Sequence, residues 1–349
     1  MLRSKLSAIA AALALGTTVA VPAAQAQDKV LNLYSARHYQ TDENLYAEFT
    51  RQTGIRINRI EAGDEAILER LRNEGANSPA DVILLVDAAR LWKAQVEGLF
   101  QPLKSALLEA RIPPTLRGKD DGKGSEWFGI STRARVIVYN KAKIDPALVQ
   151  NYEDLARPEL KGKVCTRSGA HPYMLSLIGA MSEHLGEAKA EQWASGVVAN
   201  FARSPRGGDT DQIRAVATGE CGVALTNTYY LVRLMRSNKP ADREVAERVG
   251  MVWPNQKSFG THVNVSGAAL ARHAPHRENA VRFIEYLAGD AAQAYLAGGN
   301  NEWPVVSSVK LNNRELESLG AFKADSLPLA SIGRAQIAAS KIIDRTGWR

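Results

Sequence analysis

Four tyrosines stand where predicted strands run out, and their phenols are the side chains of this sequence best suited to chemistry. Tyr39 lies in the loop after the first predicted strand, and Tyr139 ends a second strand. The adjacent pair Tyr229 and Tyr230 follows a third strand at the start of a helix. A phenol can stack on an organic solute, or it can bind a hard trivalent cation, which lowers its pKa far below the free value of about 10. The pattern leaves both kinds of binding site open.

Arginines close to these tyrosines supply the positive charge that either ligand requires. Three or four phenolates neutralise or overcompensate the charge of Fe³⁺, and nearby guanidinium groups would balance any excess; the same groups would hold an anionic solute directly. The arginines that flank the tyrosines are Arg37, Arg133, Arg135 and Arg233. Arg233 follows Tyr230 by three positions, which places the two on the same helix face.

The motifs of common enzyme classes do not occur in this sequence. The glycines of Gly118–Ser125 are spaced wrongly for a phosphate-binding loop, and no apolar strand precedes them. There is no nucleophile elbow and no paired-histidine zinc helix. Two cysteines exclude a four-cysteine zinc or iron–sulfur site. The sequence therefore gives no support for catalysis, although an exported enzyme with a tyrosine-ligated iron remains an alternative.

The first 26 residues have the pattern of a secretory signal peptide. Arg3 and Lys5 precede an apolar run, and Ala24 and Ala26 provide the small residues typical of a cleavage site. We predict cleavage after Ala26, which removes two positive charges and lowers the net charge from +7 to +5. We expect an exported, soluble protein.

The composition is that of an ordinary globular protein. Of 349 residues, 45% are hydrophobic, 23% charged and 7% aromatic, and this length predicts about two domains. Outside the first 26 residues, no stretch approaches the roughly 18 consecutive apolar residues of a membrane span. The positive charges are scattered and aromatic residues are few, so nucleic-acid binding is not expected.

Two cysteines are predicted to form a disulfide. Cys165 and Cys221 are an even pair in a chain bound for an oxidising compartment, where a disulfide is favoured over free thiols. Each lies in or beside a short strand-like run, which would suit neighbouring strands.

The elements that must position these residues alternate between strand and helix. Such alternation predicts a parallel sheet covered on both faces, and two α/β lobes with ligand chemistry at the carboxyl ends of strands. The predicted strands are 30–34, 55–60, 81–86, 135–139, 163–166, 221–226, 251–253 and 263–270. The predicted helices are 41–52, 64–73, 88–96, 174–184, 188–202, 210–218, 276–288, 291–297 and one beginning at 229.

Seven segments in collinear order carry a family resemblance. They are YSARHYQTD (34–42), TGIRIN (53–58), SPADVILLVDAARL (78–91), STRARVIVYNK (131–141), GECGVALTNTYYL (219–231), GTHVNVSGAAL (260–270) and NNEWPV (300–305). These segments resemble the periplasmic ferric-ion-binding proteins, which are the solute-binding subunits of iron ABC importers. The adjacent-tyrosine motif is the most specific part of the resemblance, which spans essentially the whole chain after the predicted signal peptide.

The resemblance implies a two-lobed α/β clamshell of the periplasmic-binding-protein type II, with two hinge crossovers. We expect the N-terminal lobe to comprise 27–132 and 258–305, and the C-terminal lobe 133–257 and 306–349, after a signal peptide at 1–26.

The resemblance also implies a set of iron ligands. Tyr229 and Tyr230 match the tyrosine pair of the family, and His38 and Tyr39 match its first-loop positions. Tyr139 matches a ligand of the subgroup that binds iron mainly through tyrosines. His38 is either a ligand or a close neighbour of the metal.

Some relatives hold a carbonate or phosphate beside the metal, and others place a glutamate ligand after the third strand. At that position this chain has Val86 beside Asp87, which favours the tyrosine-rich subgroup. Arg233 is expected to offset phenolate charge. The positions that match the anion site are Arg133, Ser168, Gly169 and Ala170.

The resemblance implies a monomeric receptor that captures Fe³⁺, with carbonate as a possible synergistic anion, and delivers it to a permease and its ATPase without catalysis. The alternative is a receptor of the same fold for an organic or phosphorus-containing anion.

Overall fold

The structure of this chain is a computed structural model that describes residues 29–37 and 40–349. The predicted signal peptide at 1–26 and the predicted ligands His38 and Tyr39 lie outside the described residues.

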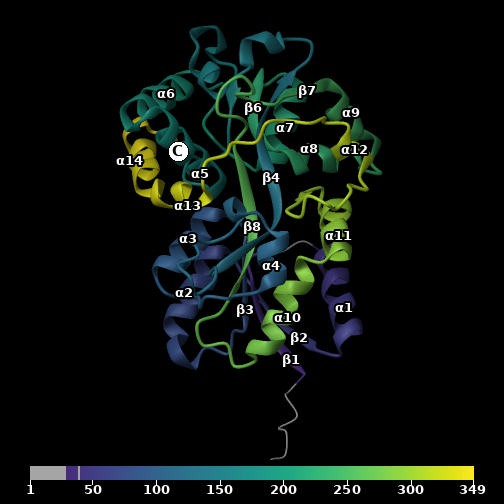
Figure 1. Ribbon diagram of the computed structural model, residues 1–349. Coiled ribbons are helices and arrows are strands. Elements are labelled where there is room, and N and C mark those ends of the chain that lie inside the picture. The colour runs from purple at the N-terminus through teal and green to yellow at the C-terminus, as the bar shows by residue number, and fades with distance from the viewer. Residues whose placement is uncertain (1–28, 38–39) are drawn as a thin grey trace, which may run out of the picture.

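Two lobes share one sheet, which runs in the order β2-β1-β3-β8-β4-β6-β5, while β7 and β9 pair with β4 (Figure 1). We call the half that holds β1–β3 the N-terminal lobe and the half that holds β5–β7 the C-terminal lobe. The strands are β1 (Val30–Ser35), β2 (Arg56–Glu61), β3 (Val82–Leu85), β4 (Trp127–Asn140), β5 (Val164–Cys165), β6 (Val223–Asn227), β7 (Val249–Val252), β8 (Val263–Leu270) and β9 (Trp303–Pro304).

The long strands β4 and β8 connect the two lobes and correct the expectation of a parallel sheet. β1 is parallel to β2 and β3, and β5 is parallel to β6, as the alternating pattern predicts. By contrast, β8 is antiparallel to β3 and β4, and β4 is antiparallel to β6. The prediction fails here because β4 carries the chain into the C-terminal lobe and β8 brings it back, so their directions are opposite.

Helices cover both faces of the sheet in each lobe (Figure 1). The N-terminal lobe carries α1 (Asp42–Thr53), α2 (Asp64–Glu74), α3 (Ala88–Val96), α4 (Ala106–Arg111), α10 (Arg277–Leu287) and α11 (Asp290–Asn300). The C-terminal lobe carries α5 (Pro172–Leu185), α6 (Glu187–Ala199), α7 (Asp209–Thr218), α8 (Thr228–Met235), α9 (Pro240–Arg248), α12 (Arg314–Glu317) and α14 (Gln336–Thr346), while α13 (Leu329–Arg334) lies between the lobes.

Each lobe has its own pair of hydrophobic cores, one on each face of the sheet. Side chains alternate between the two faces of a strand, so Val82 and Leu84 of β3 enter one core and Ile83 and Leu85 enter the other. In the C-terminal lobe, Ile137 of β4 enters one core, and its neighbours Val136 and Val138 enter the opposite one. This two-sided burial explains why the strands read as continuous apolar runs.

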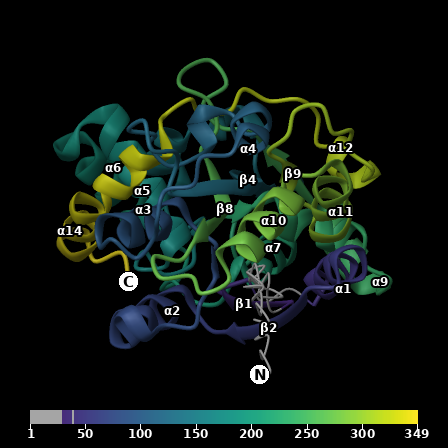
Figure 2. The same cartoon turned by 60° about the horizontal axis from the view of Figure 1, so that its bottom comes forward.

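The helix α13 joins the two lobes on one side of the molecule. It contacts both α3 and α5, and Gly333 packs so closely on Trp92 that a Cβ atom at this glycine would lie 2.4 Å from the Cβ of Trp92. Figure 2 shows α3, α5, α6 and α14 on this side of β4 and β8, with α1, α9, α11 and α12 on the other side. Among the described residues, no helix is both long and apolar enough to cross a membrane.

The predicted disulfide is confirmed. Cys165, the last residue of β5, is bonded to Cys221, which lies two residues before β6, and the Cα atoms are 5.8 Å apart. Because β5 and β6 are neighbouring parallel strands, the bond joins the two segments that end at the same edge of the sheet.

We predict that replacing both cysteines by alanine lowers the free energy of unfolding by about 3–4 kcal/mol. The bond closes a loop of 56 residues, and its loss restores conformational freedom to the unfolded chain. Urea denaturation of the oxidised wild type and of the double variant measures the difference. Equal unfolding midpoints and slopes for the two proteins would contradict the prediction.

Candidate functional site

The adjacent tyrosines lie at the carboxyl end of β6, in the first turn of α8. The Tyr229 side chain is buried, with 1% of its surface exposed, and Tyr230 is half-buried. Their ring centroids are 4.3 Å apart and the ring planes are inclined by 35°. Both phenols therefore start from one short turn that the end of a buried strand fixes in place.

A tyrosine that the sequence analysis did not select, Tyr173, completes this cluster. It lies in the first turn of α5, and the Tyr229 hydroxyl donates a hydrogen bond of 3.1 Å to the Tyr173 hydroxyl. Its ring also meets the His171 ring edge to face, with centroids 4.5 Å apart. Because β5 and β6 are parallel neighbours, the helices that follow them begin at the same edge of the sheet, and this brings the two phenols together.

The sequence holds a signal for Tyr173 that has the same form as the signal for Tyr229. A short strand at 163–166 was predicted, and Pro172 is suited to the first position of a helix. Strand, turn and helix start thus precede Tyr173, as they precede the tyrosine pair. The predicted helix began at Met174, and that error of two residues at its start left Tyr173 outside the element.

The structure does not bring Tyr139 to this cluster. Tyr139 pairs with Val223, the first residue of β6, whereas the tyrosine pair follows Asn227, the last residue. Four residues of strand correspond to about 13 Å. Its ring lies over Gly250 of β7 and packs against the core of the C-terminal lobe. The expected convergence fails because β4 runs antiparallel to β6, so the end of β4 meets the start of β6.

Three arginines surround the phenols of Tyr173 and Tyr229. The guanidinium carbons of Arg133 and Arg167 lie 5.5 Å and 5.1 Å from the Tyr173 ring centroid, within cation–π range. Arg233, which is exposed, lies 6.0 Å from the ring of Tyr229 and 5.4 Å from that of Tyr230. The positive charge expected from the sequence is therefore present at the tyrosines.

A buried carboxylate holds two of the arginines near the site in position. Asp209, the first residue of α7, is fully buried and forms ion pairs of 2.5 Å with Arg135 and 3.2 Å with Arg167. The same carboxylate accepts a hydrogen bond of 2.7 Å from the backbone N–H of Asn227 at the end of β6. One side chain thus connects the arginines to the strand that carries the tyrosine pair.

Arg133 has no carboxylate within ion-pair distance among the described residues. It is 3% exposed, and its guanidinium donates a hydrogen bond of 3.4 Å to the Ser266 hydroxyl. Burial acts to lower the pKa of Arg133, but Tyr173, Asp87 and other acidic groups nearby outweigh burial and raise its pKa above the ordinary value. Arg133 therefore places a full positive charge beside the phenols.

A small polar cavity lies behind the tyrosines. Its volume is about 10 Å³, which is enough for about one water molecule. The cavity is lined by Arg133, Arg135, Tyr173, Asn227, His262 and Asn264. Burial, with the arginines as a second cause, lowers the pKa of His262 to about 3, and the same causes lower the pKa of His171 to about 3. Both imidazoles are neutral at physiological pH, so they add no further positive charge.

The predicted anion-binding turn is bonded within the protein. The N–H of Gly169 donates to the carbonyl of Trp348 at 3.2 Å, and the N–H of Ala170 donates to the Ser168 hydroxyl at 3.3 Å. A Cβ atom at Gly169 would lie 2.4 Å from the Trp348 carbonyl oxygen, so only glycine allows this approach. The turn fixes the start of α5, and with it Tyr173.

The residues that flank the predicted first-loop ligands form a buried ion network. Arg37 forms a bidentate pair with Asp42, at 2.8 Å and 3.2 Å, and a second pair with Glu302 at 3.2 Å. Arg37 immediately precedes His38 and Tyr39, and Asp42 begins α1. This network ties the two ends of the segment that holds the predicted ligands to the N-terminal lobe.

Asp87, which follows β3 and lies beside Val86, has a structural role. Asp87 is fully buried and caps α3 by accepting a hydrogen bond of 2.8 Å from the N–H of Ala89. Its carboxylate also accepts hydrogen bonds from the Ser176 hydroxyl of α5, at 2.8 and 3.0 Å, and from the Asn264 amide at 2.9 Å. It thus joins α3 to the C-terminal lobe.

The described residues contain no group of three or more His, Cys, Asp and Glu side chains arranged to hold a metal ion.

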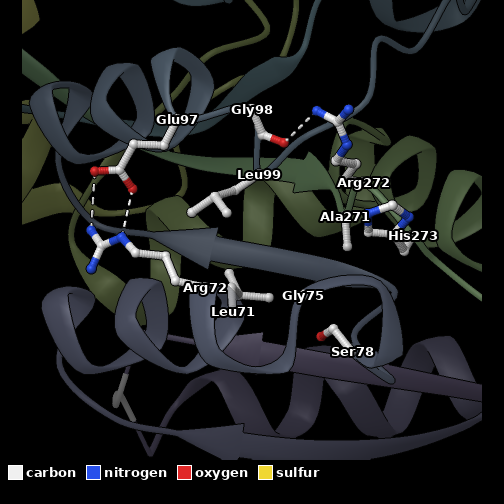
Figure 3. Close-up of a pocket in the computed structure, with 10 residues that line it drawn as sticks. All are labelled: Leu71, Arg72, Gly75, Ser78, Glu97, Gly98, Leu99, Ala271, Arg272 and His273. Carbon is white, nitrogen blue, oxygen red and sulfur yellow. Dashed lines mark hydrogen bonds and ion pairs between the residues drawn. The ribbon is translucent and has the colours of Figure 1, made fainter.

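A separate pocket of about 230 Å³ lies between α2, the end of α3 and the segment after β8 (Figure 3). There Arg72 is neutralised by Glu97 through hydrogen bonds of 2.8 and 3.1 Å, and Arg272 donates to the Gly98 carbonyl. None of the clustered tyrosines, and none of the arginines around them, lines this pocket, and those tyrosines remain the candidate site.

Residues 44–324 match the family described as bacterial extracellular solute-binding protein, and the chain belongs to that family. It is 49% identical over 323 residues to iron uptake protein A1 of Synechocystis sp., an alignment that covers 93% of this chain and 88% of the relative.

Solved structures of iron-binding proteins also resemble this chain in sequence and fold. A Trichodesmium protein in complex with iron and citrate ligands is 48% identical, with a TM-score of 0.86 and coverage of 92% of this chain and 100% of that chain. The ferric binding protein from Campylobacter jejuni is 40% identical, with a TM-score of 0.86 and coverage of 91% and 100%. The resemblance to the ferric-ion-binding proteins and the two-lobed α/β fold are confirmed.

We predict that the protein loses stability as the pH falls below about 6.5, and that His262 contributes to the loss. The folded state keeps this imidazole neutral down to about pH 3, whereas the unfolded chain protonates it near pH 6.5. Between these values the unfolded state binds more protons, so stability rises with pH by at most about 1.4 kcal/mol per unit for one histidine.

Urea denaturation between pH 4 and pH 7 tests this dependence. His262→Gln should flatten the pH dependence by about one proton, and His273→Gln, at an exposed histidine, is the matched control. The same slope in wild type and His262→Gln would contradict the prediction.

Proposed function

We propose that this chain is an exported receptor that captures Fe³⁺ between its two lobes through tyrosinate ligands and delivers it to an ABC importer. The observation that carries the proposal is the convergence of Tyr173 and Tyr229, whose hydroxyl oxygens are 3.1 Å apart beside a buried arginine. The iron-uptake and ferric-ion-binding names of the relatives support the same role.

The chemistry of the donor set favours a trivalent cation. Phenolate is a hard oxygen donor, and hard cations select oxygen ligands. Two phenol oxygens at hydrogen-bonding distance can both lose their protons only when a cation replaces the proton between them. We propose Tyr173, Tyr229 and Tyr230 from the C-terminal lobe as ligands, together with Tyr39 from the N-terminal lobe. His38 is the proposed fifth ligand.

Positive charge around the site offsets the phenolates. Four phenolates and one Fe³⁺ carry a net charge of −1, and the guanidinium groups of Arg133, Arg167 and Arg233 lie within about 6 Å of the phenol rings. Arg133 is also the residue suited to a synergistic anion. We propose that such an anion, either carbonate or citrate, binds at this edge when iron is present, and the Trichodesmium complex with iron and citrate supports that expectation.

Closure couples binding to delivery. A ligand that contacts both lobes stabilises the closed form by its difference in affinity for the two states. We propose that the lobes have the boundaries expected from the sequence and that the closed form is what a permease and its ATPase recognise. Because phenols must lose their protons to bind, iron binding should release protons and weaken at low pH. The receptor acts as a monomer in the periplasm and catalyses no reaction.

We predict that Tyr173→Phe weakens or shifts the visible absorption of the iron-loaded protein. Ferric phenolate absorbs visible light, and loss of one phenolate removes part of that charge-transfer band. The measurement is a visible titration of the purified protein with ferric citrate, beside Tyr229→Phe and Tyr230→Phe, and wild type should saturate near one iron per chain.

Tyr139→Phe is the matched control for this titration, because it removes a phenol that lies at the far end of β6. The band should be unchanged in this variant. A band that depends on Tyr139 and not on Tyr173 would contradict the ligand set. A colourless wild type that retains no iron would overturn the ferric proposal and favour a receptor for an organic or phosphorus-containing anion.

A further inference from the structure

A basic groove opens between the lobes beside the tyrosine pair. It has a volume of about 760 Å³ and is walled by α7, α8 and the start of α9 from the C-terminal lobe and by the end of α11 from the N-terminal lobe. In Figure 1 these elements meet on the side of the molecule opposite α13. The charged side chains that line it are Arg214, Arg233, Arg236, Lys239 and Asp242.

The positive charge of this groove is only partly neutralised. Arg214 is paired with Asp242 at 2.6 Å, and Arg236 lies 3.7 Å from Glu315. Arg233 and Lys239 are exposed and form no ion pair with any residue that the structure describes. Two cations therefore face solvent in one groove without a protein carboxylate, and such a concave charged surface attracts anions.

Both lobes contribute to the groove. Arg236, which directly follows α8, donates a hydrogen bond of 2.6 Å to the Asn301 side chain and a second to the Gly298 carbonyl at the end of α11. Thr41, which also lines the groove, follows the proposed ligand Tyr39 by two positions. An anion in this groove thus contacts the same two lobes that the iron bridges.

The groove adjoins the proposed metal ligands through Arg233. This guanidinium lies over the rings of both Tyr229 and Tyr230, at 6.0 and 5.4 Å from their centroids. Its other side faces the groove. A molecule held by Arg233 therefore lies next to the tyrosine pair, within reach of a metal ion bound there.

We propose that the basic groove binds the polycarboxylate that carries the iron, so that the incoming substrate is a ferric polycarboxylate and not a bare ion. This inference rests on the proposed ferric function. Fe³⁺ hydrolyses at neutral pH unless hard oxygen donors hold it, and a polycarboxylate has carboxylates to spare for arginine and lysine. Arginine matches a carboxylate with two parallel hydrogen bonds, which gives the groove selectivity for this class of anion.

The transfer is an exchange of oxygen ligands on the metal. While Arg233 and Lys239 hold the free carboxylates of the chelator, Fe–carboxylate bonds break and Fe–phenolate bonds form. The phenol protons pass to the released carboxylates or to water, and no electron is transferred. The iron remains Fe³⁺ throughout.

The first test is calorimetric titration of the iron-free protein with citrate at low ionic strength. Wild type should bind citrate saturably, and Arg233→Gln and Lys239→Gln should each weaken binding by about tenfold, as expected for the loss of a charge-assisted contact. Arg282→Gln, which removes an exposed arginine of α10 that has no ion pair among the described residues, is the matched control. Citrate binding that is absent in wild type, or equal in all four proteins, would overturn the proposal.

The second test separates this proposal from the ferric function. Iron is offered either as ferric citrate or as the neutral tris(acetohydroxamate) complex. The donor, which is itself coloured in the second case, is removed by rapid desalting at each time point, and the rate at which the protein acquires its visible band is compared. Lys239→Gln should slow loading from ferric citrate about tenfold and leave loading from the neutral complex unchanged. If Lys239→Gln acquires the band from ferric citrate at the wild-type rate, the groove proposal is overturned, while the band itself upholds the ferric function. No band from either donor would overturn both.

Discussion

Charge balance around closely spaced phenols is the constraint on which this site depends. Phenolates at the edge of a protein core repel one another, and they lose the hydration that stabilises them in water. The fold meets this constraint with buried arginines: Arg133 lies beside Tyr173, while Asp209 anchors Arg135 and Arg167. In this structure the Tyr229 hydroxyl donates a hydrogen bond to the Tyr173 hydroxyl. The proposed site requires both phenols to lose their protons to a trivalent cation, beside arginines that are already in place.

The connection between the lobes serves the same site. β4 runs through both lobes and carries Arg133 at the point where its pairing passes from β8 to β6. The parallel strands β5 and β6, joined by the Cys165–Cys221 bond, bring the first turns of α5 and α8 to one edge. The C-terminal lobe therefore presents a preformed group of phenols, and we propose that Tyr39 of the N-terminal lobe completes it when iron binds.

Much of the fold follows from hydrophobic periodicity, and the limits of that signal are also physical. The helix at 88–96 and the strand at 263–270 are where the pattern predicts them. Asp87 caps the start of the helix and Gly98 follows its end, while the strand is a run of mostly apolar and small residues. The pattern predicts strand only from Arg135, although β4 begins at Trp127, because nearly all residues of 127–134 are buried, the polar ones included, so apolar and polar residues do not alternate. Period alone also cannot give strand direction, and this is why the sheet was expected to be parallel.

Strand direction also explains why the sequence predicts the position of some tyrosines correctly and that of Tyr139 wrongly. Tyr229 and Tyr230 follow a strand and meet Tyr173, which follows that strand's parallel neighbour. Tyr139 also ends a strand, but an antiparallel one, so it lies at the opposite edge. The rule that ligands gather at carboxyl strand ends holds only within a set of parallel strands, and the sequence does not reveal which strands belong to that set.

The most direct test of the account is a crystal structure of the iron-loaded protein with anomalous diffraction measured on both sides of the iron absorption edge. The account predicts a single strong iron peak within bonding distance, roughly 2 Å, of the phenolate oxygens of Tyr173, Tyr229 and Tyr230, with Tyr39 completing the set. An iron peak elsewhere in the chain, or one at this edge whose ligands exclude Tyr173 and Tyr229, would contradict it.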